Sequence, residues 1–412
     1  MHTTSFNKKN ANVTTKYSTI TLHNLNHSQV VSDFITALSC FRSIKSRRLT
    51  IAIDKPDKYF PNACVPITGI VECLKRDGLD IEITNHPLVE DNIILNPLRF
   101  NSSAIPTAHV MNKVWEFTDS NDINFLVTKL ITSIAQSGSF ARGALDSLEW
   151  SMNEVMDNVI QHSEVDRGFV MCQVHTSAKH VAFCVFDYGI GIYESLRRSN
   201  IPPSSPVDAI TSSIQEGVTR DKNIGQGNGL WGMHQIVVNN EGRLSIISDS
   251  ATYFFVRGKA HTSSNIPILS YNKKHRNTTV DFQLDIDKEI VLPWKQSTIY
   301  TPPFQSRMEL LENGSGAILF KLAEKQGGTG TRQSGAMLRN EIHNILIETD
   351  KPIEVDFSNI SVISSSFADE LIGKLISNIG FSRFSQYIRI TNCNQFINDV
   401  IDRSVVQRLK TL

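Results

Sequence analysis

The sequence predicts an α/β (α+β) protein with more than one domain, and three observations predict it. Residues 18–84 alternate strand-like and helix-like patterns, residues 121–286 combine two helical stretches with several strand-like runs, and residues 317–409 again alternate strands and helices. Such patterns are typical of helices packed on small sheets. At 412 residues the chain is long enough for two or three domains, each with its own core.

Composition narrows the classes of function. The 41 basic and 41 acidic residues balance, so no overall field would hold the chain on nucleic acid or on an anionic membrane. No apolar run approaches the ~20 residues that a bilayer span needs, and the N-terminus has no signal-peptide core. The six cysteines are scattered without a Cys-x-x-Cys pair, which indicates buried thiols. The sequence therefore predicts a soluble, cytoplasmic protein.

The N-terminal third predicts a tail and a small domain. Residues 1–16 are rich in Asn, Thr and Lys, which predicts a disordered tail. Residues 17–120 predict a βαβ domain followed by a turn-rich linker. Its expected strands are 18–25, 49–53 and 79–84, and its expected helices are 28–44 and 62–76.

One helical segment carries the first candidate site residues. In residues 150–163, apolar side chains recur every three or four positions, which predicts an amphipathic helix packed on a sheet. Glu154 and Asn158 are four residues apart, so on a helix both side chains lie on one face and can act on one point outside it. Two solvated polar residues on an ordinary amphipathic helix are the alternative interpretation.

A second candidate site ends a predicted β-hairpin, residues 168–186. The hairpin runs into Asp187-Tyr-Gly189-Ile-Gly191, where two glycines let the backbone turn tightly and a ligand come close. A buried Asp needs a hydrogen-bond donor as its partner, and an N–H group on a flat heterocyclic ligand is a suitable donor. A plain turn is the alternative.

A glycine cluster supplies the third candidate. Gly225, Gly227 and Gly229 precede a helical pattern at residues 230–238, and the free N–H groups at such a helix start suit a phosphate. A flexible glycine turn that caps a helix would look the same. The preceding residues, 193–224, form a long segment interrupted by prolines, as a mobile lid would be.

These three motifs occur in the order found in the GHKL ATPase superfamily, which residues 121–290 resemble. The resemblance implies a Bergerat-type two-layer α/β sandwich that holds ATP and Mg²⁺ between its sheet and a lid. Glu154 would orient or deprotonate the attacking water or hydroxyl, Asn158 would coordinate Mg²⁺, and Asp187 would accept a hydrogen bond from the adenine amino group. The other nucleotide-binding positions that the resemblance implies are Gly189, Gly191, Gly225, Gly227, Gly229, Thr278 and Thr279.

Residues 291–412 resemble the STAS-like domains that are often fused to such ATPases, because a strand, an Ile-x-Ser-Ser run and an amphipathic helix follow one another. Residues 17–120 resemble a more diverged copy. In STAS-domain antagonists a GHKL partner phosphorylates a serine at the helix N-terminus, and Ser365 or Ser366 occupies the matching place. Helix N-capping is the alternative role for these serines.

The resemblances imply an ATP-binding regulatory protein in bacterial signalling. It would hydrolyse Mg-ATP or phosphorylate a serine of itself or of a protein partner. The alternative is a non-catalytic switch in which ATP sets the lid conformation and the terminal domains bind a partner. Both interpretations imply a protein partner and allow a homodimer, and neither calls for nucleic acid or a membrane.

Overall fold

The computed structural model describes residues 12–43, 48–100, 110–199, 202–218, 229–267, 276–291, 303–325 and 327–409. The chain divides into two compact units. The first comprises residues 1–130 and 151–285, and the second comprises residues 131–150 and 286–412. Both units combine helices with sheets, which confirms the predicted α/β (α+β) class.

The first unit begins with a four-stranded sheet in the order β1-β2-β3-β4. Its strands are β1 (Val13–Lys16), β2 (Thr19–Leu22), β3 (Arg48–Ile53) and β4 (Asp80–Ile83). Strands β2, β3 and β4 are parallel, because helices α1 (Gln29–Ser43) and α2 (Pro61–Arg76) connect them. This βαβαβ order is the predicted one. A short helix, α3 (Pro87–Glu90), follows.

The predicted tail was wrong in part. Residues 13–16 form β1, which pairs antiparallel with β2 and buries Val13. The β-branched Val-Thr-Thr run favours a strand, but four residues are too few to show a clear alternation in the sequence. Residues 1–11 lie outside the described part of the chain.

The first unit also contains a seven-stranded antiparallel sheet in the order β10-β9-β8-β11-β7-β6-β5. Its strands are β5 (Trp115–Phe117), β6 (Gly168–His175), β7 (His180–Asp187), β8 (Arg243–Ser248), β9 (Ala251–Val256), β10 (Lys259–Ser264) and β11 (Thr278–Asp285). The sequence did not predict β5 or β10. All six residues of β10 are exposed, so no apolar alternation marks it within its polar segment.

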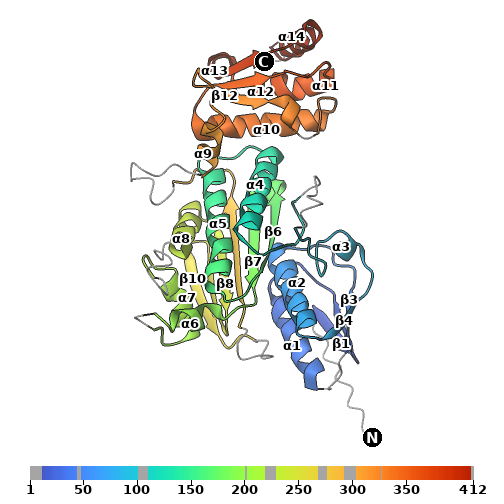
Figure 1. Cartoon of the computed structure of the whole chain (residues 1–412), viewed down its shortest axis with the longest axis vertical. Coiled ribbons are helices and arrows are strands. Elements are labelled where there is room, and N and C mark those ends of the chain that lie inside the picture. Colours follow the sequence, from blue (N-terminus) through green and yellow to red (C-terminus); the bar gives the residue numbers. More distant parts are fainter. Residues whose placement is uncertain are drawn as a thin grey trace. The chain divides into compact units, whose positions relative to one another are not determined.

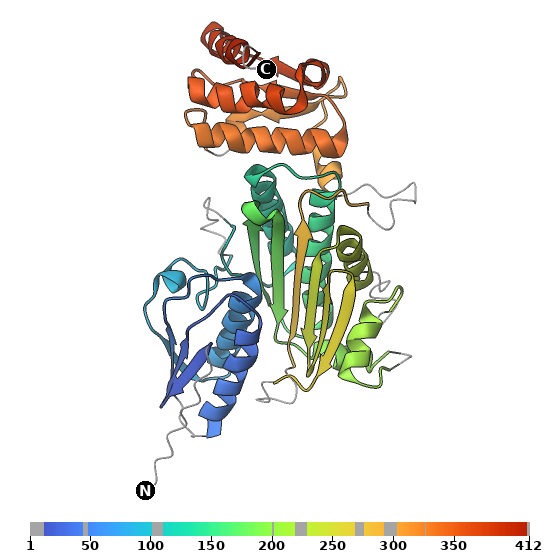
Figure 2. The ribbon, with the colours of Figure 1, turned by 180° about the vertical axis from the view of Figure 1, so that it is seen from behind.

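Helices cover both faces of this sheet. On one face, α5 (Ala144–His162) buries Met152, Val155, Met156 and Val159. Helix α8 (Gly229–Asn240) packs against β8 and β11, and α5 lies in front of the sheet in Figure 1 and behind it in Figure 2. On the other face, α2 packs against β6 and β7. The predicted two helices of residues 121–162 are α4 (Ser120–Ser137) and α5, and the unit boundary falls within both.

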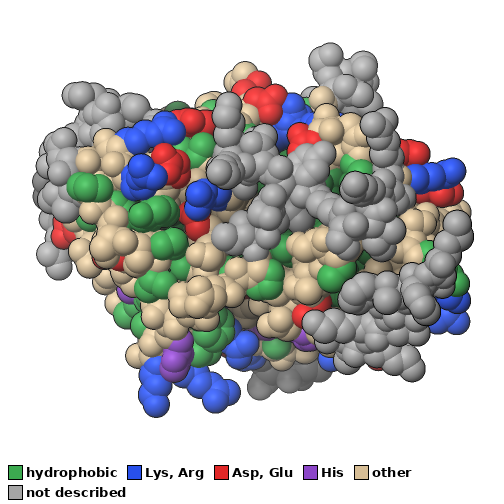
Figure 3. Space-filling model, turned by 90° about the horizontal axis from the view of Figure 1, so that it is seen from below, with side chains coloured by type: hydrophobic (Ala, Val, Ile, Leu, Met, Phe, Trp, Pro, Cys, Tyr) green, Lys and Arg blue, Asp and Glu red, His purple; other side chains and the backbone are tan. Residues whose placement is uncertain are grey.

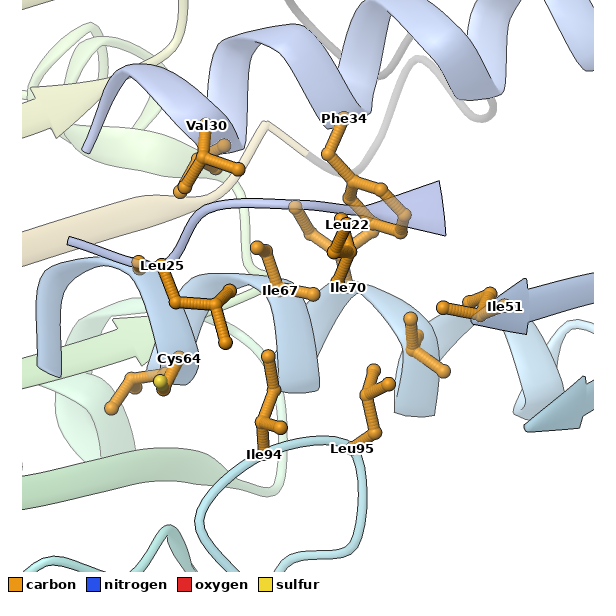
Figure 4. Close-up of a cluster of buried hydrophobic side chains, with 14 of the residues drawn as sticks. Leu22, Leu25, Val30, Phe34, Ile51, Cys64, Ile67, Ile70, Ile94 and Leu95 are labelled. Atoms are coloured by element: carbon orange, nitrogen blue, oxygen red, sulfur yellow. The ribbon is translucent and has the colours of Figure 1, made fainter. Parts of the chain in front are cut away.

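Helix α2 therefore has two hydrophobic faces. Twelve of its 16 residues are buried. One side contributes Cys64, Ile67 and Ile70 to a core shared with the four-stranded sheet (Figure 4). The same core includes Phe169 of β6 and Phe186 of β7. The predicted N-terminal domain and the central sheet thus share one continuous core.

The second unit contains a parallel three-stranded sheet, β12-β13-β14. Its strands are β12 (Ile318–Lys321), β13 (Ile353–Asp356) and β14 (Ile388–Thr391). Its main helices are α9 (Pro303–Glu309), α10 (Arg332–Thr349), α11 (Ser365–Ala368), α12 (Lys374–Ile379), α13 (Phe381–Tyr387) and α14 (Gln395–Leu409), with a π-helical turn at Asp369–Gly373 between α11 and α12. The predicted strands and the helices at α10, α11 and α14 are confirmed, whereas α9 and α13 were not predicted.

Acidic, basic and hydrophobic side chains are interspersed on the surface seen from below (Figure 3). The described part of this face carries no extended patch of one charge, in line with the balanced composition. Within the described ranges, no helix combines the length and the apolar character that crossing a membrane requires.

Candidate functional site

Helix α5 and the first turn of α8 meet at the first candidate residues. A Cβ atom built on Gly229 would lie 2.5 Å from Glu154 Oε2 and 3.7 Å from Asn158 Nδ2. The backbone at the start of α8 therefore lies directly against both side chains. Two motifs that are 71 residues apart in the sequence (158 to 229) are adjacent in the structure.

The environment of Glu154 favours proton transfer. Burial raises the pKa of this carboxyl, and the neighbouring Asp157 raises it further. A carboxylate with a raised pKa is a stronger base than an ordinary one, which suits a general base or a group that orients a nucleophile. The arrangement can therefore support the role that the sequence predicts for Glu154.

Asp187 stands at the end of β7 and is 6 % exposed. Its Oδ1 accepts a hydrogen bond from the backbone N–H of Gly189 at 2.8 Å. Burial raises the pKa of Asp187 to about 7, and the hydrogen bonds from Gly189 and from the Thr278 hydroxyl only partly oppose this effect. Among the residues that the structure describes, no cationic side chain forms an ion pair with Asp187, and such a buried carboxyl can accept a further hydrogen bond from a ligand.

The loop after Asp187 packs against the end of α5. The carbonyl of Ser163 accepts the N–H of Ile190 at 2.9 Å. A Cβ atom at Gly189 would lie 2.2 Å from that same carbonyl oxygen, so this position needs a glycine. The Asp187–Gly191 loop therefore contacts Ser163, the residue that follows α5.

The structure places Thr278, and not Thr279, beside Asp187. Thr278 pairs with Asp187 across β11 and β7, so both side chains lie on the same face of the sheet. Thr279 pairs with Phe186 and lies on the opposite face, which α2 covers. The two-residue period of a strand separates these neighbours, although the family resemblance included both.

Two residues that the sequence analysis missed hold the Gly189–Tyr193 loop. Asp249, in the β8–β9 turn, accepts hydrogen bonds from the Arg276 guanidinium at 3.0 Å and from the backbone N–H of Tyr193 at 3.4 Å. The backbone N–H of Arg276 donates to the carbonyl of Gly189 at 2.7 Å. We call Asp249 and Arg276 the loop latch.

The loop latch also explains the second glycine of the motif. Gly191 has a φ of +76°, and a Cβ atom there would lie 2.6 Å from Asp249 Oδ2. A side chain at residue 191 would be strained and would disturb the latch. Asp249 and Arg276 lie in segments without a recognisable motif, so no signal in the single sequence marks them.

Part of the predicted phosphate cradle lies beyond the described residues. Gly225 and Gly227 fall in the undescribed segment 219–228, so only Gly229 of the cluster has a described position. The predicted lid includes two described helices, α6 (Gly191–Leu196) and α7 (Pro206–Ser213).

The serines predicted in the second unit line a cavity of about 460 Å³. Ser364 accepts the N–H of Phe367 at 3.0 Å and caps α11, and its hydroxyl lies 3.1 Å from the Ser366 hydroxyl. Ser365 is exposed. The cavity is lined by Arg332, Ser365, Ser366, Asp369, Gln407 and Arg408. The capping role thus belongs to Ser364, one residue before the predicted pair.

Comparison with known families identifies one part of the chain. Residues 334–397 match the STAS-like domain of unknown function (DUF4325). The C-terminal STAS-like domain that the sequence predicts is therefore confirmed over these residues, which include most of α10, the serine run and β14. No curated protein matches the chain.

Proposed function

We propose that the central region, residues 121–290, is an ATP-binding domain of the GHKL type. It would hydrolyse Mg-ATP or transfer its terminal phosphate to a serine of this chain or of a partner protein. The observation that supports this proposal best is that Gly229 contacts Glu154 and Asn158 of α5, while the Asp187–Gly191 loop contacts Ser163 just beyond the same helix. An acceptor for a base, a carboxylate–carboxamide pair and a bare helix start are the parts that nucleotide chemistry needs.

The residues at this place suit a nucleotide with its metal. Asp187 has a raised pKa and a single described side-chain partner, Thr278. It would accept a hydrogen bond from the adenine amino group. Asn158 would hold Mg²⁺ through its amide oxygen, an atom type that this ion prefers. Bound Mg²⁺ neutralises phosphate charge. Glu154 would orient the water or hydroxyl, and Gly229 brings the bare backbone of a helix start against Glu154 and Asn158.

A binding measurement tests the site. Wild-type protein and Asp187→Ala would be titrated with a fluorescent ATP analogue in the presence of Mg²⁺, and folding would be checked by circular dichroism. We expect the substitution to weaken binding by about a hundredfold, because the donor of the base loses its buried acceptor. Unchanged affinity in a folded Asp187→Ala variant would refute the site.

A second experiment separates catalysis from sensing. Purified protein would be incubated with ATP labelled at the γ-phosphate, with Glu154→Ala as the control. Free phosphate would indicate hydrolysis, and labelled protein would indicate a kinase. Exposure of Ser365 beside a cavity makes it the first acceptor to examine by mass spectrometry.

The alternative function is a non-catalytic ATP-sensing switch. The STAS-like domain supports it, since ATP could control contacts with a protein partner without being consumed. Tight ATP binding without phosphate release or labelled protein would favour the switch.

A further inference from the structure

Helix α10 of the STAS-like domain presents a row of three polar side chains, of which two are buried. Asn340, Asn344 and Glu348 are spaced four residues apart, so they lie along one face of the helix. Asn344 is 1 % exposed and Glu348 is 7 % exposed. Because burying such groups is unfavourable unless they are hydrogen-bonded, their partners indicate what this face is built to hold.

The partners all belong to the last turn of α4 or to the segment that joins α4 to α5, both of which are part of the same compact unit. Asn344 Nδ2 donates to the carbonyls of Ala135 and Gly138, each at 2.8 Å, and its Oδ1 accepts the N–H of Phe140 at 2.9 Å. Asn340 donates to the carbonyl of Gln136 at 3.1 Å. These carbonyls lie at or just beyond the end of α4, where helices leave acceptors unsatisfied.

Glu348 performs the matching task at the start of α5. Both of its carboxylate oxygens accept the backbone N–H of Gly143, at 3.0 and 2.9 Å. The N–H of Ser147 donates to the Gly143 carbonyl at 3.0 Å, so Gly143 is the N-cap of α5. A glutamate that binds the N-cap N–H normally comes from the third residue of the same helix. Here the STAS-like domain supplies it, and its charge also suits the positive end of the helix.

The turn that receives these bonds tolerates little change. Gly143 has a φ of +77°, and a Cβ atom there would lie 1.9 Å from the carbonyl oxygen of Ile290. The N–H of Ile290 in turn donates to the Arg142 carbonyl at 3.0 Å. The start of α5 is therefore fixed from two sides by the second unit.

We propose that Asn344 and Glu348 are positioning residues for Glu154 and Asn158. They cap the end of α4 and the start of α5 from the STAS-like domain, and α5 continues without interruption to the two site residues. The distance from Gly143 to Asn158 along the helix is about 20 Å, which a continuous helix spans as one rigid element.

The inference rests in part on the proposed nucleotide site, so its main test avoids nucleotide. Amide hydrogen exchange would be measured on the full-length protein for wild type, Glu348→Ala and Asn344→Ala. Glu324→Ala and Asn398→Ala, which alter exposed positions of the same domain, are the matched controls. We expect at least fivefold faster exchange in residues 140–146, because a lost cap frees the first turn of the helix, and also in residues 154–162, because the positioning role requires the loosening to reach the two site residues.

Faster exchange confined to residues 140–146, or no change, would overturn the positioning role. Should Glu348→Ala fail to fold, Glu348→Gln keeps an acceptor without the charge and should give a smaller increase in both segments. A second arm measures the affinity for the ATP analogue, which we expect to fall about fivefold in Glu348→Ala with folding retained. Failure of the wild-type protein to bind the analogue would refute the proposed function alone, since the exchange result still decides whether α10 positions the helix.

Discussion

Gly69 and Gly229 belong to helices on opposite faces of the seven-stranded sheet, and they leave room for different neighbours. A Cβ atom on Gly69 would lie 2.2 Å from Phe186 Cδ1, inside the core shared by α2 and the sheet. A Cβ atom on Gly229 would meet the terminal oxygen of Glu154 instead. The α2 face is filled by packing, whereas the α5 face keeps polar groups and bare backbone together.

Two buried carboxyls repeat this contrast. Burial raises the pKa of both Asp187 and Asp281 to about 7, and each is 6 % exposed. Asp187 lies beside the glycine loop, whereas Asp281 lies under α2 and accepts a hydrogen bond from Asn62 at 3.3 Å. The two carboxyls thus share the same burial, with a glycine loop beside Asp187 and a helix over Asp281.

The largest expected effect comes from neutralising the covered carboxyl. The pKa of Asp281 is about 7 in the folded chain and near 3.8 in the unfolded chain, so its contribution to stability is full below pH 3.8 and is lost as the pH rises to 7. We expect Asp281→Asn to raise the free energy of unfolding by up to about 3 kcal/mol at pH 8 and by little at pH 4. Urea unfolding at both pH values measures it, with exposed Asp80→Asn as the control; a gain of equal size at both would contradict this account.

The second-largest effect is expected from adding a methyl group to the packed α2 face. In Gly69→Ala the new methyl group would displace the Phe186 ring, and the higher helix propensity of alanine offsets part of the cost. We expect a loss of about 2 kcal/mol in the free energy of unfolding, measured by urea denaturation. Gly78→Ala is a poor control because its φ is +85°, so Gly138→Ala, which meets nothing within 4 Å, serves instead. An unchanged midpoint would mean that α2 does not pack on β7 as described.

The open face should respond to pH through ligand binding. If Asp187 accepts from the base as a carboxylate, binding must release its proton below a pKa of about 7. The affinity for ADP should then rise about tenfold between pH 6 and pH 8. Calorimetric titration of wild type and Asp187→Asn, which has no such proton, separates this effect from titration of the phosphates. Parallel pH profiles for the two proteins would exclude Asp187 as the acceptor.

The smallest effect is expected from Gly229→Ala. Its methyl group needs only a movement of the flexible Glu154 carboxylate, so the melting temperature should stay within about one degree of wild type. ATP-analogue affinity should fall about fivefold, because the added group occupies space beside Glu154 and Asn158. Thermal melting and fluorescence titration give both values. A loss of stability equal to that of Gly69→Ala would show that the two faces do not differ.

The sequence predicted an element well where its apolar periodicity and its flanking turn signals pointed to the same structure. Helix α2 was expected at residues 62–76 and runs from Pro61 to Arg76, because its apolar residues and flanking turn signals agree. The contact of Gly229 with Glu154 and Asn158 fits the order of these motifs in the family resemblance. The partner of the second face of α2 was not predicted, since periodicity shows that a side is apolar and not what covers it.

Contacts made by isolated polar residues were also beyond prediction. Asp249, Arg276, Asn344 and Glu348 each act through a partner far away in the sequence, and none belongs to a motif. Thr279 shows that a family resemblance can also include a residue that lies away from the site. A resemblance brought it to the site, but the alternation of β11 turns it to the other face.

The burial of both faces of α2 has a practical consequence for the design of truncated proteins. A protein begun at residue 121 would keep most of the seven-stranded sheet and lose the helix that seals β6 and β7, leaving Phe169, Met171 and Phe186 bare to water. Such a shortened chain would aggregate through that surface. The N-terminal segment therefore covers apolar surface of the central sheet that would otherwise be exposed to water.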